Sequence, residues 1–383
     1  MIDRAWDAGR VADRLQLRAI QLGRPLTCTL ELTYRCNFRC RMCYVRMTDE
    51  QAEAHGRLRT VEEWLDMARQ LRDAGVLYID LTGGECTLYP GFARLYDELS
   101  RMGFLISVMS NAGRYDESLK AMFKRMPPYA AVISLYGGSK EAYGAVTGDP
   151  DAYERVVDNI CFFRSIGVPV SLNFTVIRDN VRDYPKVRAL CDELGLGCTL
   201  TTDITPHRYG AHLSETAECR LTTAERVCVA CSRPDDVEKA LAEAPTLERL
   251  LDGFEPPLAP PENLPMPGNM CIGARTACAI AWNGDMQTCV SLLGYENVHP
   301  FDTGFEAAWA QLKARQAETF AAPAACALCD MAEECTHNCA GRRFEGTGSP
   351  HEPDRELCRY TYLFRRFGET HGDAIPSRAP DCT

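Results

Sequence analysis

Three cysteines near the start of the chain have a spacing that suits an iron–sulfur cluster. Cys36, Cys40 and Cys43 follow one another at intervals of three and two intervening residues. Three thiolates can hold three irons of one [4Fe–4S] cube, which leaves the fourth iron free to bind and reduce a small molecule. A coordinating thiol must lose its proton, and structural cysteines do not gather in this way without a metal. The alternative is a set of three buried or zinc-binding cysteines.

The run from Thr33 to Tyr44 resembles the signature of the radical S-adenosylmethionine (SAM) superfamily. The resemblance implies that SAM chelates the open iron through its methionine amino and carboxylate groups. It also implies that one electron cleaves SAM to methionine and a 5′-deoxyadenosyl radical. Met42 stands where the family often has an aromatic residue, and an apolar methionine can still pack on adenine.

Composition favours a cytoplasmic protein with metal sites. The chain has 383 residues, enough for one large and one small domain, and its 20 cysteines favour metal sites over disulfides in that compartment. Neither an apolar run of about 18 residues nor an apolar signal core is present, so we expect no transmembrane helix and no secretion. The net charge of -11 argues against binding to nucleic acid or to an anionic membrane.

Strand and helix patterns alternate between residues 26 and 205. Strands are expected over 26–32, 76–81, 104–109, 131–135, 168–177 and 197–201, with helices over 60–74, 92–102, 116–125, 152–166 and 183–194. Thr60 and Glu63 form a predicted capping box at the first of these helices. The alternation predicts an α/β fold with a parallel sheet in a partial (β/α)6 TIM-like barrel. Its chemistry is expected at the C-terminal strand ends.

The rest of the chain is expected to form smaller units around this barrel. The predicted order is an N-terminal helical segment (1–25), the barrel (26–205), a helical and Pro-rich bridge (206–270), a small cysteine-rich, loop-rich domain (271–365) and a tail (366–383). Two short helices are expected in the bridge, over 223–231 and 235–243.

A glycine pair and a carboxylate follow the second predicted strand. Gly83, Gly84 and Glu85 resemble the family's motif for the SAM amino group, since glycines allow close backbone approach and a carboxylate can bind an ammonium. Cys86 replaces the proline that usually comes next. We interpret Cys86 as a small turn residue, with a reactive thiol near the radical as the alternative.

Three further strand ends resemble SAM contacts of the family. Asn111 ends the third strand, Ser134 the fourth, and Val176 the fifth. Each of them is equally compatible with a strand cap or a turn.

The C-terminal cysteines match the seven-cysteine pattern of the SPASM extension, which is found on radical SAM peptide maturases. The matching residues are Cys271, Gly284, Cys289, Cys326, Cys329, Cys335, Cys339 and Cys358. With this pattern the resemblance covers nearly the whole chain, from about residue 26 to 365.

The resemblance implies two auxiliary [4Fe–4S] clusters, and therefore three clusters in total. Cys271, Cys289 and Cys339 would hold the first, with Cys278 between them as its fourth ligand. If Cys278 is not a ligand, that cluster has an open iron that can bind a substrate thiol. The second cluster would be held by Cys326, Cys329, Cys335 and Cys358. Zinc, which also accepts four thiolates, is the alternative metal.

The resemblance implies an enzyme that oxidatively modifies a ribosomally synthesised peptide, by forming a thioether or a carbon–carbon crosslink. We expect a flavodoxin- or ferredoxin-type electron donor. About 25 residues precede the barrel, too few for a winged-helix leader-binding module, so a separate leader-binding protein is a possible partner.

Three alternatives stay open. The first is an anaerobic sulfatase-type formylglycine maturase, although Val290 stands where those relatives carry an acidic base. The others are radical SAM oxidation of a small metabolite and a non-enzymatic iron–sulfur scaffold or sensor. The sequence does not assign the catalytic acid or base among the candidates near strand ends, which are Tyr44, Tyr136, His207, Arg208, Tyr209 and His212.

Overall fold

A single mixed sheet forms the centre of the computed structural model, which describes residues 8–209, 213–256, 271, 275–327, 329–332, 335 and 339–371. The sheet has eight strands in the order β6-β5-β4-β3-β2-β1-β7-β8. The strands are β1 (Thr27–Glu31), β2 (Tyr78–Thr82), β3 (Leu105–Ser110), β4 (Ala130–Leu135), β5 (Val170–Thr175), β6 (Cys198–Thr201), β7 (Ala277–Ile280) and β8 (Met286–Gln287). All neighbours pair in parallel except β7 and β8, which are antiparallel.

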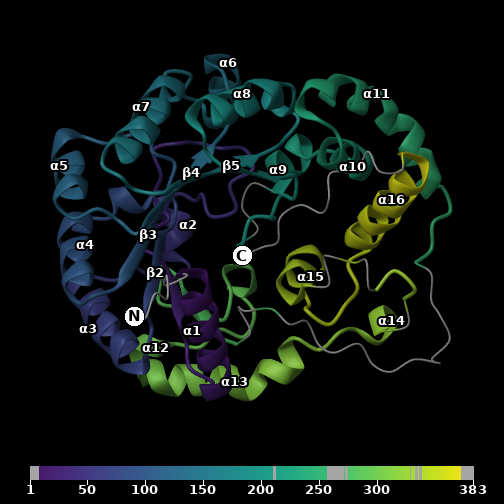
Figure 1. Ribbon diagram of the computed structural model, residues 1–383. Helices are drawn as coiled ribbons and strands as arrows, with labels where there is room; N and C mark the ends of the chain where they lie inside the picture. The colour runs from purple at the N-terminus through teal and green to yellow at the C-terminus, as the bar shows by residue number, and fades with distance from the viewer. Residues whose placement is uncertain are drawn as a thin grey trace, which may run out of the picture.

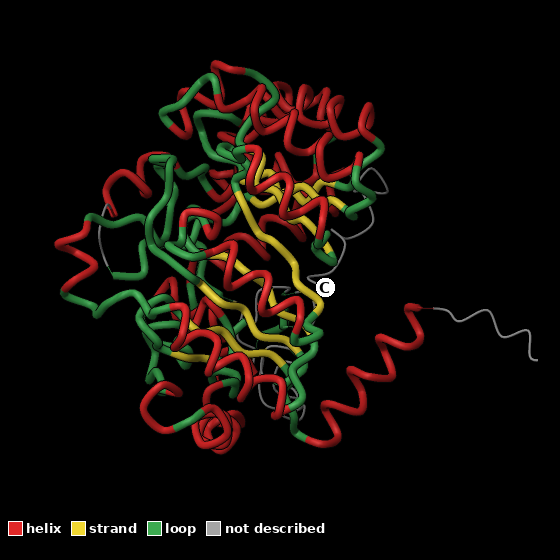
Figure 2. The backbone as a smooth tube through the Cα atoms, turned by 90° about the vertical axis from the view of Figure 1, so that its left-hand side faces the viewer, coloured by secondary structure: helices red, strands yellow, loops and turns green. Residues whose placement is uncertain are grey.

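Helices surround this sheet. They are α1 (Ala8–Leu22), α2 (Asp49–Glu53), α3 (Val61–Ala74), α4 (Phe92–Arg101), α5 (Glu117–Arg125), α6 (Lys140–Thr147), α7 (Ala152–Ser165), α8 (Tyr184–Leu194), α9 (Leu213–Cys219), α10 (Thr223–Cys231), α11 (Val237–Glu248), α12 (Pro300–Thr303), α13 (Phe305–Thr319), α14 (Ala324–Ala327), α15 (Ala340–Thr347) and α16 (Arg355–His371). Figure 1 shows α3, α4 and α5 on one side of the molecule and α14, α15 and α16 on the other. Figure 2 shows helices in front of the strands when the molecule is seen from the first of these sides.

The predicted partial barrel is confirmed, and local sequence signals explain its elements. Helix α3 begins after Thr60, whose side chain accepts a hydrogen bond from the Glu63 amide while Glu63 reaches back to the Thr60 amide. Gly75 ends this helix in the left-handed conformation, which a residue without Cβ adopts at no steric cost. Strands β1 to β6 and helices α3, α4, α5, α7 and α8 coincide with the predicted segments to within a few residues, whereas the short helices α2 and α6 were not predicted.

Two strands of the sheet were not predicted. Strand β7 comes from beyond residue 271, in the region assigned to the cysteine-rich domain, and pairs in parallel with β1. Strand β8 then returns antiparallel to β7. The sheet therefore continues into the C-terminal region, and β1 is an interior strand of the complete sheet.

The C-terminal region packs around its own smaller clusters. Helix α10 lies against α11 and α16, with Cys228, Cys231, Leu363 and Phe367 buried between them. Most of the predicted Pro-rich bridge, from residue 257 to 270, lies outside the described residues. In the part of the chain that the structure describes, no helix has the length and apolar character needed to cross a membrane.

Candidate functional site

The first cysteine set lies in the loop that leaves the C-terminal end of β1. Cys40 is buried, while Cys36 and Cys43 are partly exposed. The Cys43 amide donates to the Cys40 carbonyl at 3.2 Å, and the Phe38 amide donates to the Cys36 sulfur at 3.4 Å. The loop thus brings the three thiols together at the strand end, as the spacing predicted.

The protonation of these thiols supports a metal as their natural partner. Burial, opposed in part by hydrogen bonding, raises the pKa of Cys36 to about 12 and places the pKa of Cys40 well above its ordinary value. Burial also raises the pKa of Cys43. Neighbouring thiolates would repel one another, so a cation must stabilise the deprotonated forms. The loop therefore fits a positively charged iron centre that binds all three sulfurs.

The glycine pair is explained first by packing against the cysteine loop. Gly84 donates to the Thr33 carbonyl at 2.6 Å, and Glu85 donates to the Arg35 carbonyl at 2.9 Å. A Cβ on Gly84 would stand 2.5 Å from the carbonyl oxygens of Tyr34 and Arg35, so no larger residue fits there. These contacts fix the start of the cysteine loop against the end of β2.

Glu85 is buried and already holds several hydrogen bonds. Its Oε1 accepts from the Thr87 amide at 3.2 Å, the Thr87 hydroxyl at 2.7 Å and the Ser110 hydroxyl at 2.8 Å. Its Oε2 accepts from the Asn111 amide at 2.8 Å. Oε2 accepts one hydrogen bond where Oε1 accepts three, so Oε2 can accept from one more donor, such as an ammonium. Glu85 therefore ties β2 to β3, and its contact with the SAM amino group stays a prediction.

Asn111 connects β3 to the cysteine loop. Its side-chain amide donates to the Cys36 sulfur at 3.4 Å and to the Asn37 side chain at 3.0 Å. Its side-chain oxygen accepts from the Gly113 amide at 2.8 Å. Hydrogen bonds to cluster sulfurs are one of the protein's means of setting a cluster potential. Asn111 is thus placed beside the cluster ligands, and a SAM contact remains a prediction.

The other predicted SAM contacts lie at the same edge of the sheet. Ser134 lies in β4, opposite Asn173 of β5, and is partly buried. Val176 is fully buried in the main core, and its amide donates to the Thr201 carbonyl at 2.8 Å. Cys86 is also fully buried, in keeping with a small turn residue.

The structure brings three of the four cysteines predicted for the first auxiliary cluster together. Cys271 and Cys289 pack against the same small cluster, made by Leu292, Phe320 and Ala340. Burial raises the pKa of Cys289 to about 12, and the charges of Cys339 and Cys271 add to this. Cys339 is the N-cap of α15 in the same region.

Cys278, which was predicted as the fourth ligand of this cluster, occupies a different place from the other three cysteines. It lies in β7 directly opposite Cys28 of β1, and its thiol donates to the Thr27 carbonyl at 3.8 Å. Cys278 is 2% exposed and belongs to the main core, whereas Cys271 and Cys289 belong to the smaller cluster. The intervening sequence alone could not show that this segment adds a strand to the barrel. The structure thus places Cys278 in the barrel core, and its role as a ligand stays a prediction.

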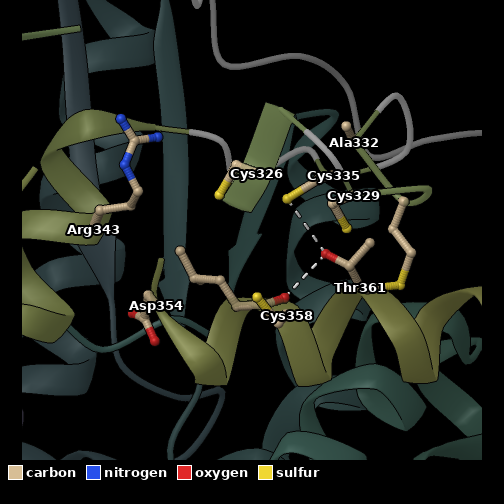
Figure 3. A pocket seen from close by; sticks show the side chains of 10 residues that line it. Cys326, Cys329, Ala332, Cys335, Arg343, Asp354, Cys358 and Thr361 are labelled. Carbon is tan, nitrogen blue, oxygen red and sulfur yellow. Dashed lines mark hydrogen bonds between the residues drawn. The ribbon is translucent and has the colours of Figure 1, made fainter. Parts of the chain in front are cut away.

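The four cysteines predicted for the second auxiliary cluster line one pocket. Figure 3 shows Cys326, Cys329, Cys335 and Cys358 around it, together with Arg343, Asp354 and Thr361. The Thr361 hydroxyl donates to the Cys335 sulfur at 3.6 Å. Burial raises the pKa of Cys358 to about 12 and raises those of Cys326 and Cys329. Four partly buried thiols around one hollow fit a cluster that takes its ligands from α14, from the segment that follows it and from α16.

Within the described residues, no three cysteine, histidine or carboxylate side chains lie close enough to hold a single metal ion. In a cube each thiolate binds a different iron, so the sulfurs stand farther apart than the ligands of one ion. The cysteine sets are compatible with this wider spacing.

A buried ion pair lies beside the first cysteine set, and one of its two members, Glu31, was not among the candidate residues taken from the sequence. Glu31 ends β1 and is fully buried; both of its oxygens accept from Arg208, at 2.7 and 2.8 Å. Arg208 also donates its amide to the Tyr44 carbonyl at 3.0 Å, and its guanidinium lies over the Tyr44 ring. Desolvation lowers the pKa of Arg208, but the charge and the hydrogen bonds of Glu31 more than offset this effect, so the guanidinium keeps its positive charge. The pair fixes the loop after β6 against the cysteine loop.

Glu345 of α15 is a second residue that sequence reasoning missed. The Thr205 hydroxyl donates to its Oε2 at 3.3 Å, and Ser291, two residues after Cys289, forms a further hydrogen bond. Burial raises the pKa of Glu345, and the hydrogen bonds and the charges of Arg342 and Arg208 oppose this only in part. The negative charge of Glu345 in turn contributes to the raised pKa values of Tyr44 and Cys289. Glu345 therefore interacts both with Tyr44, next to the first cysteine set, and with Cys289 of the first auxiliary set, which no spacing in the sequence indicates.

The remaining acid–base candidates have structural partners. His207 contacts the Arg46 carbonyl at 2.5 Å and accepts from the Tyr209 amide at 3.2 Å. Tyr209 stacks on His55 with 3.8 Å between the ring centroids. Tyr136 packs edge-on against Phe38 of the cysteine loop. His212 lies outside the described residues.

Comparisons with known proteins find a family match within the first half of the chain. Residues 30–191 match the model of the radical SAM superfamily. A probable GTP 3′,8-cyclase of Saccharolobus solfataricus is 32% identical over 178 residues, which are 46% of this chain and 56% of that protein. The chain thus spans little more than half the length of the curated relatives that it matches.

Solved structures with the same fold extend over most of the chain. SuiB of Streptococcus suis, bound to its precursor peptide SuiA, has a TM-score of 0.61 and 16% identity, covering 94% of this chain and 82% of that one. The structure of anSMEcpe with bound AdoMet has a TM-score of 0.61 and 15% identity, covering 90% of this chain and 93% of that one. At these identities the likeness shows a shared fold, including the cysteine-rich C-terminal region.

Proposed function

Because the chain belongs to the radical SAM superfamily through residues 30–191, we propose that it is a SAM-cleaving enzyme that oxidatively modifies a ribosomally synthesised peptide. The observation that carries this proposal is the four-cysteine pocket on the same chain as the three-cysteine loop. The fold likeness to SuiB, which was solved with its precursor peptide, supports a peptide as the substrate.

The residues at the end of β1 fit SAM and its cluster. Cys36, Cys40 and Cys43 would hold three irons, and the remaining acceptor position of Glu85 suits the SAM ammonium. When bound, the cluster and SAM supply a 5′-deoxyadenosyl radical that removes a hydrogen atom from the substrate. The chain orients this site through Gly84, Glu85 and Asn111, whose hydrogen bonds join β2, β3 and the cysteine loop.

A two-electron oxidation of the peptide also requires the loss of one proton and one electron. Glu345 would take the proton, because it interacts with both Tyr44 and Cys289 and because burial raises its pKa. The auxiliary clusters proposed in the C-terminal region would take the electron.

The first auxiliary site has a further consequence for substrate binding. With Cys278 in the barrel core, the proposed ligands of the first auxiliary cluster are Cys271, Cys289 and Cys339. Three thiolates on a cube leave one iron for an outside ligand, and a cysteine thiol of the peptide suits it. This arrangement favours a thioether product. A flavodoxin- or ferredoxin-type donor and a separate leader-binding protein are the proposed partners.

One observation also supports the formylglycine alternative. Val290 lacks the acidic group that such maturases carry after the cysteine, but Glu345 supplies a carboxylate to Ser291 next to it. The two products differ in composition. A thioether keeps the cysteine sulfur and loses two hydrogens, whereas formylglycine made from cysteine loses the sulfur.

Co-expression tests the proposal. The chain is produced anaerobically with the short open reading frames that flank its gene, and each peptide is weighed by mass spectrometry. We expect one peptide to lose two hydrogens with its sulfur retained, and to stay unchanged when Cys36, Cys40 and Cys43 are replaced by Ala. Unchanged flanking peptides, together with SAM cleavage that a small-metabolite extract stimulates, would contradict a peptide substrate.

A further inference from the structure

Arg343 places a buried positive charge among the C-terminal cysteines. It lies on α15 and is 2% exposed. Its side chain lines the four-cysteine pocket, where Figure 3 shows it on the same side as Cys326. A buried guanidinium stays protonated under all ordinary conditions, so the charge is permanent.

Two carbonyl groups hold this charge in place. Arg343 donates from Nε to the Pro350 carbonyl at 2.6 Å and from Nη2 to the Ala321 carbonyl at 3.1 Å. Its own amide donates to the Cys339 carbonyl at 3.0 Å, in the first turn of α15. The guanidinium is therefore fixed at both the backbone and the side chain, and it cannot turn toward solvent as a surface arginine does.

Arg343 lies beside cysteines of both auxiliary sets. It lines the same pocket as Cys326 and Cys335, which belong to the second set, and its amide bonds to the carbonyl of Cys339, which belongs to the first. The charges of these three cysteines act on the guanidinium. Each thiolate-ligated cube is more negative after reduction than before. A fixed cation in a medium of low dielectric constant stabilises the reduced form more, and so raises the reduction potential.

We propose that Arg343 is a shared electrostatic positioning residue that raises the reduction potentials of both auxiliary clusters. This inference rests on the auxiliary clusters of the proposed function. A higher reduction potential makes these clusters better electron acceptors, because it favours transfer of the electron that the oxidised substrate gives up.

The neighbouring arginine offers a matched control. Arg342 is the preceding residue on α15, but its side chain is 32% exposed and pairs with Asp203. Replacing Arg342 removes the same charge from the same helix turn, at a position that is paired with a carboxylate and open to solvent. The effect on either auxiliary cluster should be small, because exposed charges are screened.

The test is a redox titration followed by electron paramagnetic resonance on the reconstituted full chain, without peptide. Arg343→Gln should lower the ratio of reduced to oxidised auxiliary cluster at least tenfold at a given potential, which is a fall of about 59 mV for one electron. Arg343→Lys should keep both potentials near the wild-type values, because it retains the charge. Arg342→Gln should do the same.

The possible results separate this inference from the proposed function. Wild-type protein with about four irons instead of about twelve would mean that the auxiliary clusters themselves are absent. Normal iron with unchanged potentials in Arg343→Gln would overturn the role of Arg343. Equal falls in Arg343→Lys and Arg343→Gln would also overturn it, because the lost carbonyl contacts would then explain both.

A titratable variant decides the question if Arg343→Gln does not bind its clusters. In Arg343→His the side-chain charge depends on pH, because imidazole loses its proton in the range of about pH 5 to 8. Both auxiliary potentials should then fall as the pH rises through this range, by more than in the wild type. Potentials that follow the wild-type pH dependence in this variant would overturn the inference.

Discussion

Replacing Glu85 by Gln tests the conclusion that this carboxylate holds the SAM site together before any ligand binds. Oε1 accepts hydrogen bonds from Thr87 and Ser110, and Oε2 accepts from the Asn111 amide. A glutamine has only one oxygen. Its most favourable orientation keeps that oxygen toward Thr87 and Ser110, and then turns its amide group toward the Asn111 N–H, which is also a donor.

The magnitude follows from the one hydrogen bond that this orientation cannot keep. A hydrogen bond to a charged group contributes about 1.5–3 kcal/mol. Since each 1.4 kcal/mol is a factor of ten, local opening at Asn111 should become roughly 10- to 150-fold more favourable. Hydrogen–deuterium exchange of a peptide covering residues 105–113, measured without SAM, reports this opening directly.

Two controls make the result specific. Ser110→Ala removes one donor from Oε1 but leaves the acceptor of the Asn111 amide, so exchange at Asn111 should change less. Glu98→Gln alters a carboxylate on the exposed face of α4 and should change nothing at β3. Protection of Asn111 in Glu85→Gln within a factor of two of the wild type would refute the structural role, even if SAM affinity fell.

Three further predictions concern Cys278, Glu345 and Glu63. Cys278→Ala should keep the full iron and sulfide content and lose only about 1 kcal/mol of stability, because a buried atom is removed from the core; loss of about four irons would restore Cys278 as a ligand. Glu345→Gln should form 5′-deoxyadenosine normally while product formation falls by about 10²–10⁴-fold, with Glu352→Gln, an exposed position, as the control; normal product yield would remove Glu345 from the mechanism. The hydrogen bond from Arg57, with weaker help from the helix start, lowers the pKa of Glu63 from 4.5 to about 2. As the pH falls, Glu63 is therefore protonated in the unfolded state before it is protonated in the folded state. The ionised Glu63 thus stabilises the fold above pH 4.5, and this contribution is lost as the pH falls toward 2. Glu63→Gln should thus lower the unfolding free energy by about 1 kcal/mol at neutral pH, and the difference should shrink below pH 4.5 in denaturant titrations; a constant difference would contradict the assignment.

Much of the barrel could be predicted because its signals are local. Thr60 and Glu63 specify a helix start by reciprocal hydrogen bonds between residues three apart, and the structure shows this capping box. Strand β7 could not be found in this way. Ala277–Ile280 is a short apolar stretch in a region dominated by cysteines, and its identity as a strand depends on pairing with β1, about 250 residues earlier.

The same limit separates what was predicted in the site from what was missed. Cys36, Cys40 and Cys43 are close in sequence and remain close in space, since one loop carries them. Cys278 was placed with the auxiliary ligands because it lies between two of them in sequence, but the sheet takes it into the core. Glu345 becomes relevant only because α15 packs beside Ser291, a contact that no spacing encodes.

The central claim, that the loop after β1 carries a cluster that cleaves SAM, is tested most directly by the amount of 5′-deoxyadenosine formed from SAM and dithionite by the anaerobically reconstituted protein. We predict formation of 5′-deoxyadenosine by the wild type and none above background when Cys36, Cys40 and Cys43 are all replaced by Ala, while about two-thirds of the iron remains bound. Equal 5′-deoxyadenosine from the two proteins, or none from a fully loaded wild type, would contradict the claim.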